Sequence, residues 1–273
     1  MSDLVHDLIF TAARRTPGAP ALAYGDDKLD YQALAGAVRG AASALLGAGV
    51  GPRERVAAYL EKRIENVAAM FGASAAGAVF VPVNPQLKAD QVAYILADCA
   101  VRVLVTSSDR LRNLAPALAQ CPALHTVFIV GAGAVAADAG TYRVLPWDAA
   151  APGAEPHSAI DADMAAILYT SGSTGKPKGV VLSHRNIVAG ARSVAGYLGN
   201  TASDRILAAL PLSFDYGLSQ LTTAFHVGAT AVLINHLFAR DIVKMASPAW
   251  PPCRRYGSSC RSWRGRRRAA CAT

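Results

Sequence analysis

A ten-residue segment from Thr170 to Gly179 (TSGSTGKPKG) concentrates groups that bind polyphosphate. It contains three glycines, four hydroxyl side chains and two lysines. Glycine lets several backbone N–H groups converge on one anion, hydroxyls add hydrogen-bond donors, and lysine supplies a point charge for phosphate. We therefore predict that this segment forms a phosphate-binding loop. The alternative is a flexible Gly/Ser hairpin at the surface, which would not need two lysines and four hydroxyls.

The loop differs from the GxxxxGK[ST] phosphate loop in two places. Thr170 occupies the position of the first glycine, and Pro177 follows Lys176. Proline cannot continue a helix, because it lacks the N–H and its ring clashes with the preceding turn. The loop is therefore expected between two strands, 164–169 and 180–182, rather than at the start of a helix.

Alternating strands and helices are expected to position this loop. Short runs of branched apolar residues predict strands, and apolar residues spaced three or four apart predict helices. The alternation favours an α/β fold, a wound, mostly parallel sheet with helices on both faces. The predicted strands are 21–24, 56–60, 79–83, 101–105, 126–130, 142–145, 164–169, 180–182 and 229–234. The predicted helices are 4–15, 34–45, 64–71, 91–96, 113–119, 184–198 and 216–225.

Three smaller features complete this outline. Residues 131–162 are rich in Ala, Gly, Asp and Pro, and we expect them to form a surface excursion. Ser183 is expected to cap the helix that follows the loop, with His184 in its first turn at the surface. Because no strand is predicted after 229–234, we expect an edge of the sheet and apolar surface to be exposed.

Composition excludes several classes of protein. The 273 residues are 52% hydrophobic and 17% charged, which excludes global disorder and allows a sizeable core. The net charge of +8 is misleading, because residues 246–273 hold seven arginines and no acid; residues 1–245 keep 20 of the 27 basic side chains and all 19 acidic ones. The charge of this body gives no reason to expect a nucleic-acid partner.

The cysteines and the apolar stretches indicate a soluble protein of a reducing compartment. The five cysteines form no paired framework and no spacing that would hold zinc, so no metal site is expected from them. The N-terminus lacks the cations and apolar run of a signal peptide. The apolar stretch 67–87 is broken by glycine and proline, which argues against a membrane span. We therefore expect a cytoplasmic location.

Residues 169–179 (YTSGSTGKPKG) resemble the signature loop of the adenylate-forming superfamily, which includes acyl-CoA synthetases, luciferases and adenylation domains of peptide synthetases. The resemblance extends over residues 1–245. Residues 29–34 (LDYQAL), 77–85 (GAVFVPVNP) and 210–217 (LPLSFDYG) are similar to three further segments of that superfamily. In their details, residues 60–88 and 210–220 most resemble the AMP-forming acyl-CoA ligases associated with exosortase systems.

The resemblance implies a fold and a two-step reaction. The fold would be the N-terminal part of the large domain of these enzymes. A carboxylate would attack the α-phosphate of ATP, giving an acyl-adenylate and pyrophosphate, and a thiol, usually that of coenzyme A, would then take the acyl group. ATP, Mg²⁺ and coenzyme A are the implied cofactors, and the partners are a small carboxylate and a CoA or carrier thiol. Loop residues implied around the β- and γ-phosphates are Thr170, Ser171, Gly172, Ser173, Thr174, Gly175, Lys178 and Gly179, with Lys176 either joining them or facing solvent.

The resemblance also places Phe214, Asp215 and Tyr216 at the substrate pocket. In amino-acid-activating members an aspartate at this place pairs with the ammonium of the substrate, so Asp215 suggests an amine-bearing acid. The alternative for Asp215 is a helix cap before 216–225. Tyr216 is interpreted as core or pocket wall rather than as a catalytic group.

Residues 246–273 depart from the pattern of the superfamily. They lose periodicity and accumulate Arg, Cys, Ser, Pro and Trp. Superfamily members continue with further ATP-binding segments and a small C-terminal domain that carries a catalytic lysine, and none of these follows residue 245. We expect residues 1–245 to be a partial AMP-binding domain and residues 246–273 to be a disordered segment translated out of frame. The alternative is a genuine basic tail that binds nucleic acid or acidic lipid.

Three functional hypotheses follow. The first is an AMP-forming acyl-CoA ligase, of which this chain would be a truncated and inactive form. The second is an amino-acid-adenylating enzyme of the same superfamily. The third is a remnant without catalytic activity that binds nucleotide. The sequence does not identify the acid.

Overall fold

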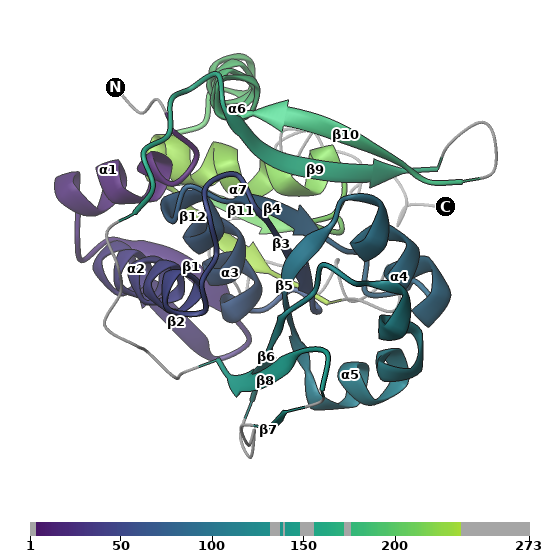
Figure 1. Cartoon of the computed structure of the whole chain (residues 1–273). Coiled ribbons are helices and arrows are strands. Elements are labelled where there is room, and N and C mark those ends of the chain that lie inside the picture. Colours follow the sequence, from purple (N-terminus) through teal and green to yellow (C-terminus); the bar gives the residue numbers. More distant parts are fainter. Residues whose placement is uncertain (1–3, 132–136, 139, 148–155, 172–175, 236–273) are drawn as a thin grey trace, which may run out of the picture.

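Two β-sheets organise the chain (Figure 1). The computed structural model describes residues 4–131, 137–138, 140–147, 156–171 and 176–235. The smaller sheet has the strand order β11-β12-β1-β2, in which β11, β12 and β1 run parallel and β2 is antiparallel. Its strands are β1 (Pro20–Tyr24), β2 (Asp27–Asp30), β11 (Arg205–Ala208) and β12 (Thr230–Leu233).

The larger sheet has eight strands in the order β10-β9-β4-β3-β5-β6-β8-β7. Its six inner strands run parallel, and β10 and β7 are antiparallel edge strands. Its strands are β3 (Arg55–Tyr59), β4 (Val79–Pro82), β5 (Val101–Ser107), β6 (Thr126–Val130), β7 (Ala137–Asp138), β8 (Arg143–Pro146), β9 (Met164–Thr170) and β10 (Lys178–Ser183).

Helices cover both faces of the larger sheet (Figure 1). The outer layer consists of α4 (Ala89–Asp98), α5 (Ser108–Leu114) and a 3₁₀ helix (Ala115–Gln120). The inner layer contains α1 (Asp7–Arg15), α2 (Tyr31–Gly47), α3 (Ile64–Ala75), α6 (His184–Leu198) and α7 (Asp215–Val227). Helix α3 contacts strands of both sheets, so one apolar core joins the two sheets through the inner helices.

Strand β6 shows how the sequence produces these layers. Its side chains alternate, so Phe128 and Val130 join the inner core, whereas Val127 and Ile129 pack under the outer helices. This alternation follows from the two-residue period of a strand. A run of apolar residues with both faces covered is typical of parallel sheets.

Helices α2 and α3 approach each other at Gly72. A Cβ atom added to Gly72 would lie 2.5 Å from the Cβ of Ala41, so glycine is required for this approach. The neighbouring Phe71 packs edge-on against Phe225 of α7, with ring centroids 5.3 Å apart. The three inner helices therefore meet at one tightly packed point.

The predicted fold class is observed: mostly parallel sheets lie between helices, and the predicted phosphate loop joins two strands. The predicted cap is also confirmed, because the Oγ of Ser183 accepts a hydrogen bond from the backbone N of Asn186 at 3.2 Å. Helix α7 starts at Asp215 with Phe214 as its N-cap residue, and Asp215 makes no capping hydrogen bond. The interpretation of Asp215 as a helix cap is therefore wrong.

Several expected elements differ in the structure. Strand β2 was not predicted, because its residues are mainly polar and only its pairing with β1 makes it a strand. The segment predicted as a helix at 113–119 is mostly 3₁₀ helix, with Pro116 in its first turn. In the smaller sheet the edge strands are β11 and β2, and β12 lies between β11 and β1.

The strand predicted at 142–145 is observed as β8, and it belongs to the larger sheet instead of a surface excursion. Strand β8 pairs in parallel with β6, and Trp147 packs edge-on against Phe128 with ring centroids 5.6 Å apart. Further along, the main chain at His157 lies so close to Gly77 that an added Cβ there would be 2.6 Å from its carbonyl oxygen. The predicted segment 246–273 lies outside the described residues. Among the helices described, none is long and apolar enough to span a bilayer.

His184 is buried, not at the surface as expected. It is 1% exposed, and its Nδ1 accepts a hydrogen bond from the backbone N of Val5 at 3.1 Å. The ring of His6 stands edge-on to it with centroids 6.2 Å apart. Burial, together with the charge of His6, lowers the pKa of His184 to about 4. The neutral ring thus fastens the start of α1 to α6.

A substitution at the α2–α3 contact tests this packing. Gly72→Ala should lower the free energy of unfolding by about 1–3 kcal/mol, because the added methyl group overpacks the contact. The matched control is Gly40→Ala on the exposed side of α2, where an added Cβ meets no atom within 4 Å. That change should raise stability by about 0.5–1 kcal/mol. Urea unfolding measures both values, and equal effects would contradict the packing described.

A second prediction concerns acid stability. The pKa of His184 is lower in the folded chain than the ordinary value of 6.5, so the unfolded chain binds the proton more tightly. The contribution of neutral His184 to the free energy of unfolding is fully present above pH 6.5. It is lost as the pH falls towards 4, which lowers the free energy of unfolding by up to about 3 kcal/mol. In His184→Asn the amide oxygen can accept from Val5 without titrating. Urea unfolding across this range should show a smaller pH dependence for the variant, and equal slopes would refute the assignment.

Candidate functional site

The predicted phosphate loop closes the hairpin of β9 and β10. In the antiparallel register Thr170 lies opposite Lys178, and Tyr169 lies opposite Gly179. Residues 172–175 lie outside the described residues, so Gly172, Ser173, Thr174 and Gly175 remain predictions. The structure places the other predicted members at the base of the loop, all of them exposed: Thr170, Ser171, Lys176, Lys178 and Gly179.

Two tyrosine hydroxyls, one on β9 and one on α4, link the base of this loop to helix α4. The hydroxyl of Tyr169 donates a hydrogen bond to Oδ2 of Asp98 at 2.6 Å, and the hydroxyl of Tyr94 donates to the carbonyl oxygen of Pro177 at 3.3 Å. Burial and the Asp98 carboxylate raise the pKa of Tyr169, so its hydroxyl stays protonated as a donor. Sequence analysis missed these contacts, because they join residues 71 and 83 positions apart.

The two lysines of the loop stand in different surroundings. Lys176 Nζ lies 5.9 Å from the ring centroid of Tyr94, and its side chain is exposed. Lys178 is the first residue of β10, across the hairpin from Thr170. Gly179 follows Lys178 and lies opposite Tyr169, and only glycine fits there, since an added Cβ would lie 2.8 Å from Cγ2 of Ile167 and 3.2 Å from Cζ of Tyr169.

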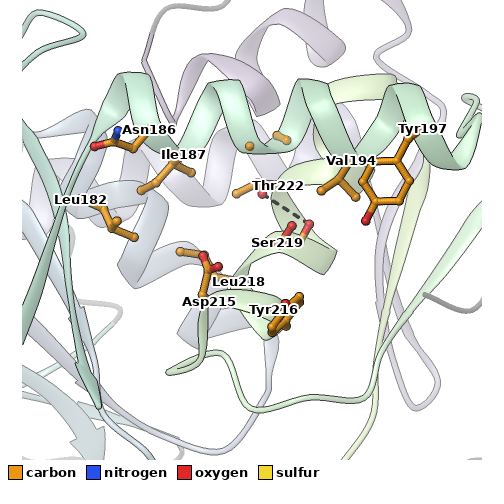
Figure 2. Close-up of a pocket in the computed structure, with 12 residues that line it drawn as sticks. Leu182, Asn186, Ile187, Val194, Tyr197, Asp215, Tyr216, Leu218, Ser219 and Thr222 are labelled. Atoms are coloured by element: carbon orange, nitrogen blue, oxygen red, sulfur yellow. Dashed lines mark hydrogen bonds between the residues drawn. The ribbon is translucent and has the colours of Figure 1, made fainter. Parts of the chain in front are cut away.

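A groove of about 150 Å³ lies beside the hairpin, between α6 and α7 (Figure 2). Leu182 of β10, Ile187 and Val194 of α6, and Leu218 of α7 give it apolar walls. Asp215 and Tyr216, two of the predicted pocket residues, also line it. The third, Phe214, is half exposed at the start of α7 and does not line this groove.

Asp215 supplies a negative charge at the groove. Among the described residues its carboxylate has no recorded hydrogen-bond or ion-pair partner, and it stands in the first turn of α7, where the helix dipole favours an anion. The groove thus combines apolar walls with one uncompensated carboxylate. This arrangement can take a small organic molecule, including one that carries a cation.

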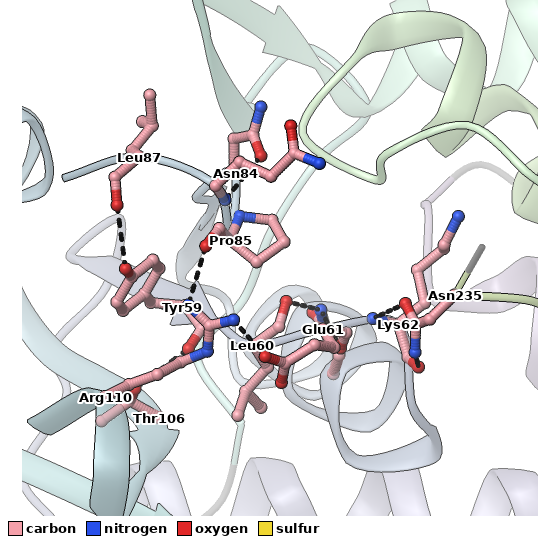
Figure 3. A network of polar contacts seen from close by, with 12 residues as sticks. Tyr59, Leu60, Glu61, Lys62, Asn84, Pro85, Leu87, Thr106, Arg110 and Asn235 are labelled. Atoms are coloured by element: carbon pink, nitrogen blue, oxygen red, sulfur yellow. Dashed lines mark hydrogen bonds and ion pairs between the residues drawn. The ribbon is translucent and has the colours of Figure 1, made fainter. Parts of the chain in front are cut away.

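A larger cavity of about 520 Å³ lies at the carboxyl ends of parallel strands (Figure 3). It is lined by residues that follow strands of both sheets: Lys62 after β3, Asn84 after β4, Leu210 after β11 and Asn235 after β12. Ligands of α/β proteins commonly bind at such an edge. Sequence analysis did not single out Lys62 or Asn235, because neither belongs to a local pattern.

An ion pair closes one side of this cavity. Arg110 pairs with Glu61 and also donates to the carbonyl oxygen of Pro85 at 2.8 Å. Its guanidinium lies over the ring of Tyr59, 4.6 Å from the centroid. The hydroxyl of Tyr59 in turn donates to the carbonyl oxygen of Leu87 at 3.1 Å. These contacts fasten the segment after β4 to the end of β3.

Within the described part of the chain, no group of three or more His, Cys, Asp or Glu side chains is placed to hold a metal ion. These residues therefore do not supply a Mg²⁺ site by themselves. The structure records Cys99 and Cys121 as free thiols.

Comparison with known proteins identifies the family in which this arrangement occurs. The family described as "AMP-binding enzyme" matches residues 9–247. The "Anguibactin system regulator" of Vibrio anguillarum is 30% identical over 242 residues, which cover 88% of this chain and 21% of that protein.

Two solved structures are similar over most of this chain. The anthranilate CoA ligase AuaEII in complex with anthranoyl-AMP superposes with a TM-score of 0.78 at 27% identity, over 89% of this chain and 48% of that one. VinN in complex with 3-methylaspartate superposes with a TM-score of 0.72 at 27% identity, over 89% of this chain and 64% of that one. The chain thus spans less than two thirds of the length of each of these three proteins. The predicted fold, the N-terminal part of the large domain of adenylate-forming enzymes, is confirmed.

Proposed function

Because this chain belongs to the AMP-binding enzyme family, we propose that it activates a carboxylic acid with ATP and passes the acyl group to the thiol of coenzyme A. The observation that carries the proposal is the β9–β10 hairpin, which hydrogen bonds hold against α4, with an apolar groove beside it. The hairpin supplies donors and cations for phosphates, and the groove supplies walls for an acid. Since the chain spans only part of its relatives, the activity is proposed for these residues within the complete enzyme.

In the first step, an oxygen of the substrate carboxylate attacks the α-phosphorus of ATP. The bond from the α-phosphorus to the bridging oxygen breaks, and pyrophosphate leaves with the electron pair. We assign Thr170, Ser171, residues 172–175, Lys178 and Gly179 to the β- and γ-phosphates. Donors and cations held in place stabilise the charge that develops on the leaving pyrophosphate.

In the second step, the sulfur of the thiol attacks the acyl carbon of the adenylate, and AMP leaves. We assign the acyl group to the groove between α6 and α7, where Ile187, Val194 and Leu218 exclude water. Tyr216 forms part of the wall. Water exclusion protects the mixed anhydride from hydrolysis before the thiol arrives.

We also propose the finer assignment to the acyl-CoA ligases associated with exosortase systems. The basis is the sequence of two segments, 60–88 and 210–220, which line the cavity and lead into the groove. Two free thiols in the described residues are consistent with a cytoplasmic reaction.

A second candidate is activation of an amine-bearing acid. Asp215 favours it, because a carboxylate at the groove without a recorded partner is suited to pair with an ammonium group. The similarity to VinN, which was solved with 3-methylaspartate, points the same way. The acceptor would then be a carrier thiol instead of coenzyme A.

Exchange of labelled pyrophosphate into ATP tests the first step. A full-length enzyme that contains these residues should catalyse exchange with at least one acid of a panel that spans fatty, aromatic and amino acids. Lys178→Met should slow exchange about 10- to 100-fold, because it removes a cation from the phosphate site. The control, Lys28→Met on the exposed strand β2, should stay within about twofold of the parent. No exchange with any acid, by a full-length enzyme shown to be folded, would overturn the proposed function.

The substrate class is tested by Asp215→Ala. If the aspartate pairs with an ammonium group, the variant should activate amino acids at least about tenfold less well than the parent, measured by kcat/KM for exchange. For acids without an amine, kcat/KM for exchange should fall less than about threefold. A uniform effect on both classes would remove the second candidate.

A further inference from the structure

The side chain of Lys62 connects the end of β3 to the loop between β11 and α7. Figure 3 shows Lys62 beside Asn235. Its Nζ donates hydrogen bonds to the carbonyl oxygen of Ala209 at 2.6 Å and to that of Leu210 at 3.3 Å. Lys62 is only 8% exposed. Lysine is among the residues least often fully buried, so this placement needs a reason.

The described residues record no carboxylate within ion-pair distance of Lys62. Burial lowers its pKa to about 8, and no opposite charge offsets the burial. The two carbonyl oxygens are therefore the groups that hold the ammonium. A buried cation kept without a counterion is costly, so its hydrogen bonds to this loop should be strong ones.

The main chain of Lys62 is itself held in place. Its backbone N donates to Oδ1 of Asn235 at 3.1 Å, and its carbonyl oxygen accepts from Nδ2 of the same residue at 2.7 Å. Asn235 follows β12 in the smaller sheet, whereas Lys62 follows β3 in the larger one. The lysine therefore reaches the loop from a point that is fixed to both sheets.

The loop needs such an anchor, because packing does not hold it on every side. Residues 209–213 border the cavity of about 520 Å³. On the opposite side Gln220 of α7 accepts from the backbone N of Leu210 at 3.2 Å and donates to the carbonyl oxygen of Leu207 at 2.9 Å. Gly217 lets the chain turn back tightly, since a Cβ there would lie 1.9 Å from the carbonyl oxygen of Pro211.

We propose that Lys62 is a positioning residue for the substrate groove. By holding the carbonyl groups of residues 209–210, it fixes the loop that leads directly into Phe214, Asp215 and Tyr216. Two of these residues line the groove. The inference rests on the proposed function for the meaning of the groove, whereas the anchoring of the loop can be tested without any substrate.

Hydrogen–deuterium exchange tests the anchoring. Lys62→Met keeps the length and burial of the side chain and removes its donors. Amides in residues 210–218 should exchange roughly tenfold faster or more in this variant. Amides of β5 and β6, on the far side of the larger sheet, should exchange at the parent rate. Lys28→Met, at an exposed lysine of β2, should leave all of these regions unchanged.

A second variant separates anchoring from a general loss of stability. Lys62→Ala leaves space beside the cavity for n-butylammonium, which carries the missing methylenes and ammonium group. Adding n-butylammonium should restore slow exchange in residues 210–218 in a saturable way, whereas tetramethylammonium, which has no N–H donor, should not. Unchanged exchange in Lys62→Met, equal acceleration throughout the chain, or no difference between the two amines would overturn the proposal.

The pyrophosphate exchange assay measures how the loss of the Lys62 contacts affects the groove. Lys62→Met should raise KM for the acid at least about fivefold while KM for ATP stays within about twofold, because the loop leads into Asp215 and Tyr216 of the groove and not into the phosphate hairpin. Equal rises in both constants would contradict the positioning role. If the full-length enzyme without this substitution shows no exchange activity, the proposed function fails, and the amide exchange experiment still decides whether Lys62 anchors the loop.

Discussion

The antiparallel pairing of β9 with β10 is the constraint on which the site depends. It places Thr170 opposite Lys178, so both sides of the phosphate loop leave the sheet at the same level. A slip by one residue would turn every side chain of β10 to the other face. Gly179 belongs to this register, because a larger residue would collide with Ile167 and Tyr169. The hydrogen bonds from Tyr169 and Tyr94 then fasten the hairpin to α4 and to the folded body.

The two sheets give this hairpin its surroundings. Helix α3 contacts both sheets and packs closely against α2 at Gly72, so the inner core behaves as one unit. Helix α6 leaves β10 directly and packs on α7, and the groove forms between these two helices. The phosphate loop and the groove thus lie at opposite ends of one strand.

Much of the fold could be predicted from local patterns, and much of the site could not. Buried strands such as β5 and β6 have continuous apolar runs, and Pro177 excludes a helix directly after the loop. Strand β2 is polar and exists through its partner, so no local pattern indicated it. The prediction that His184 lies at the surface was wrong for the same reason: its partner, the backbone of Val5, is distant in the sequence. Lys62 and Ala209 are 147 residues apart, and only the folded chain brings them together.

The most direct test of this account is whether the hairpin binds the phosphates of ATP. ³¹P NMR of ATP titrated with the folded chain should show the β- and γ-phosphorus resonances shifting or broadening more than the α resonance. Excess pyrophosphate should reverse the change, because it competes for the same donors. If the chain is folded and all three resonances stay at their free positions, the segment from Thr170 to Gly179 is not a phosphate-binding loop, and the account of the site is wrong.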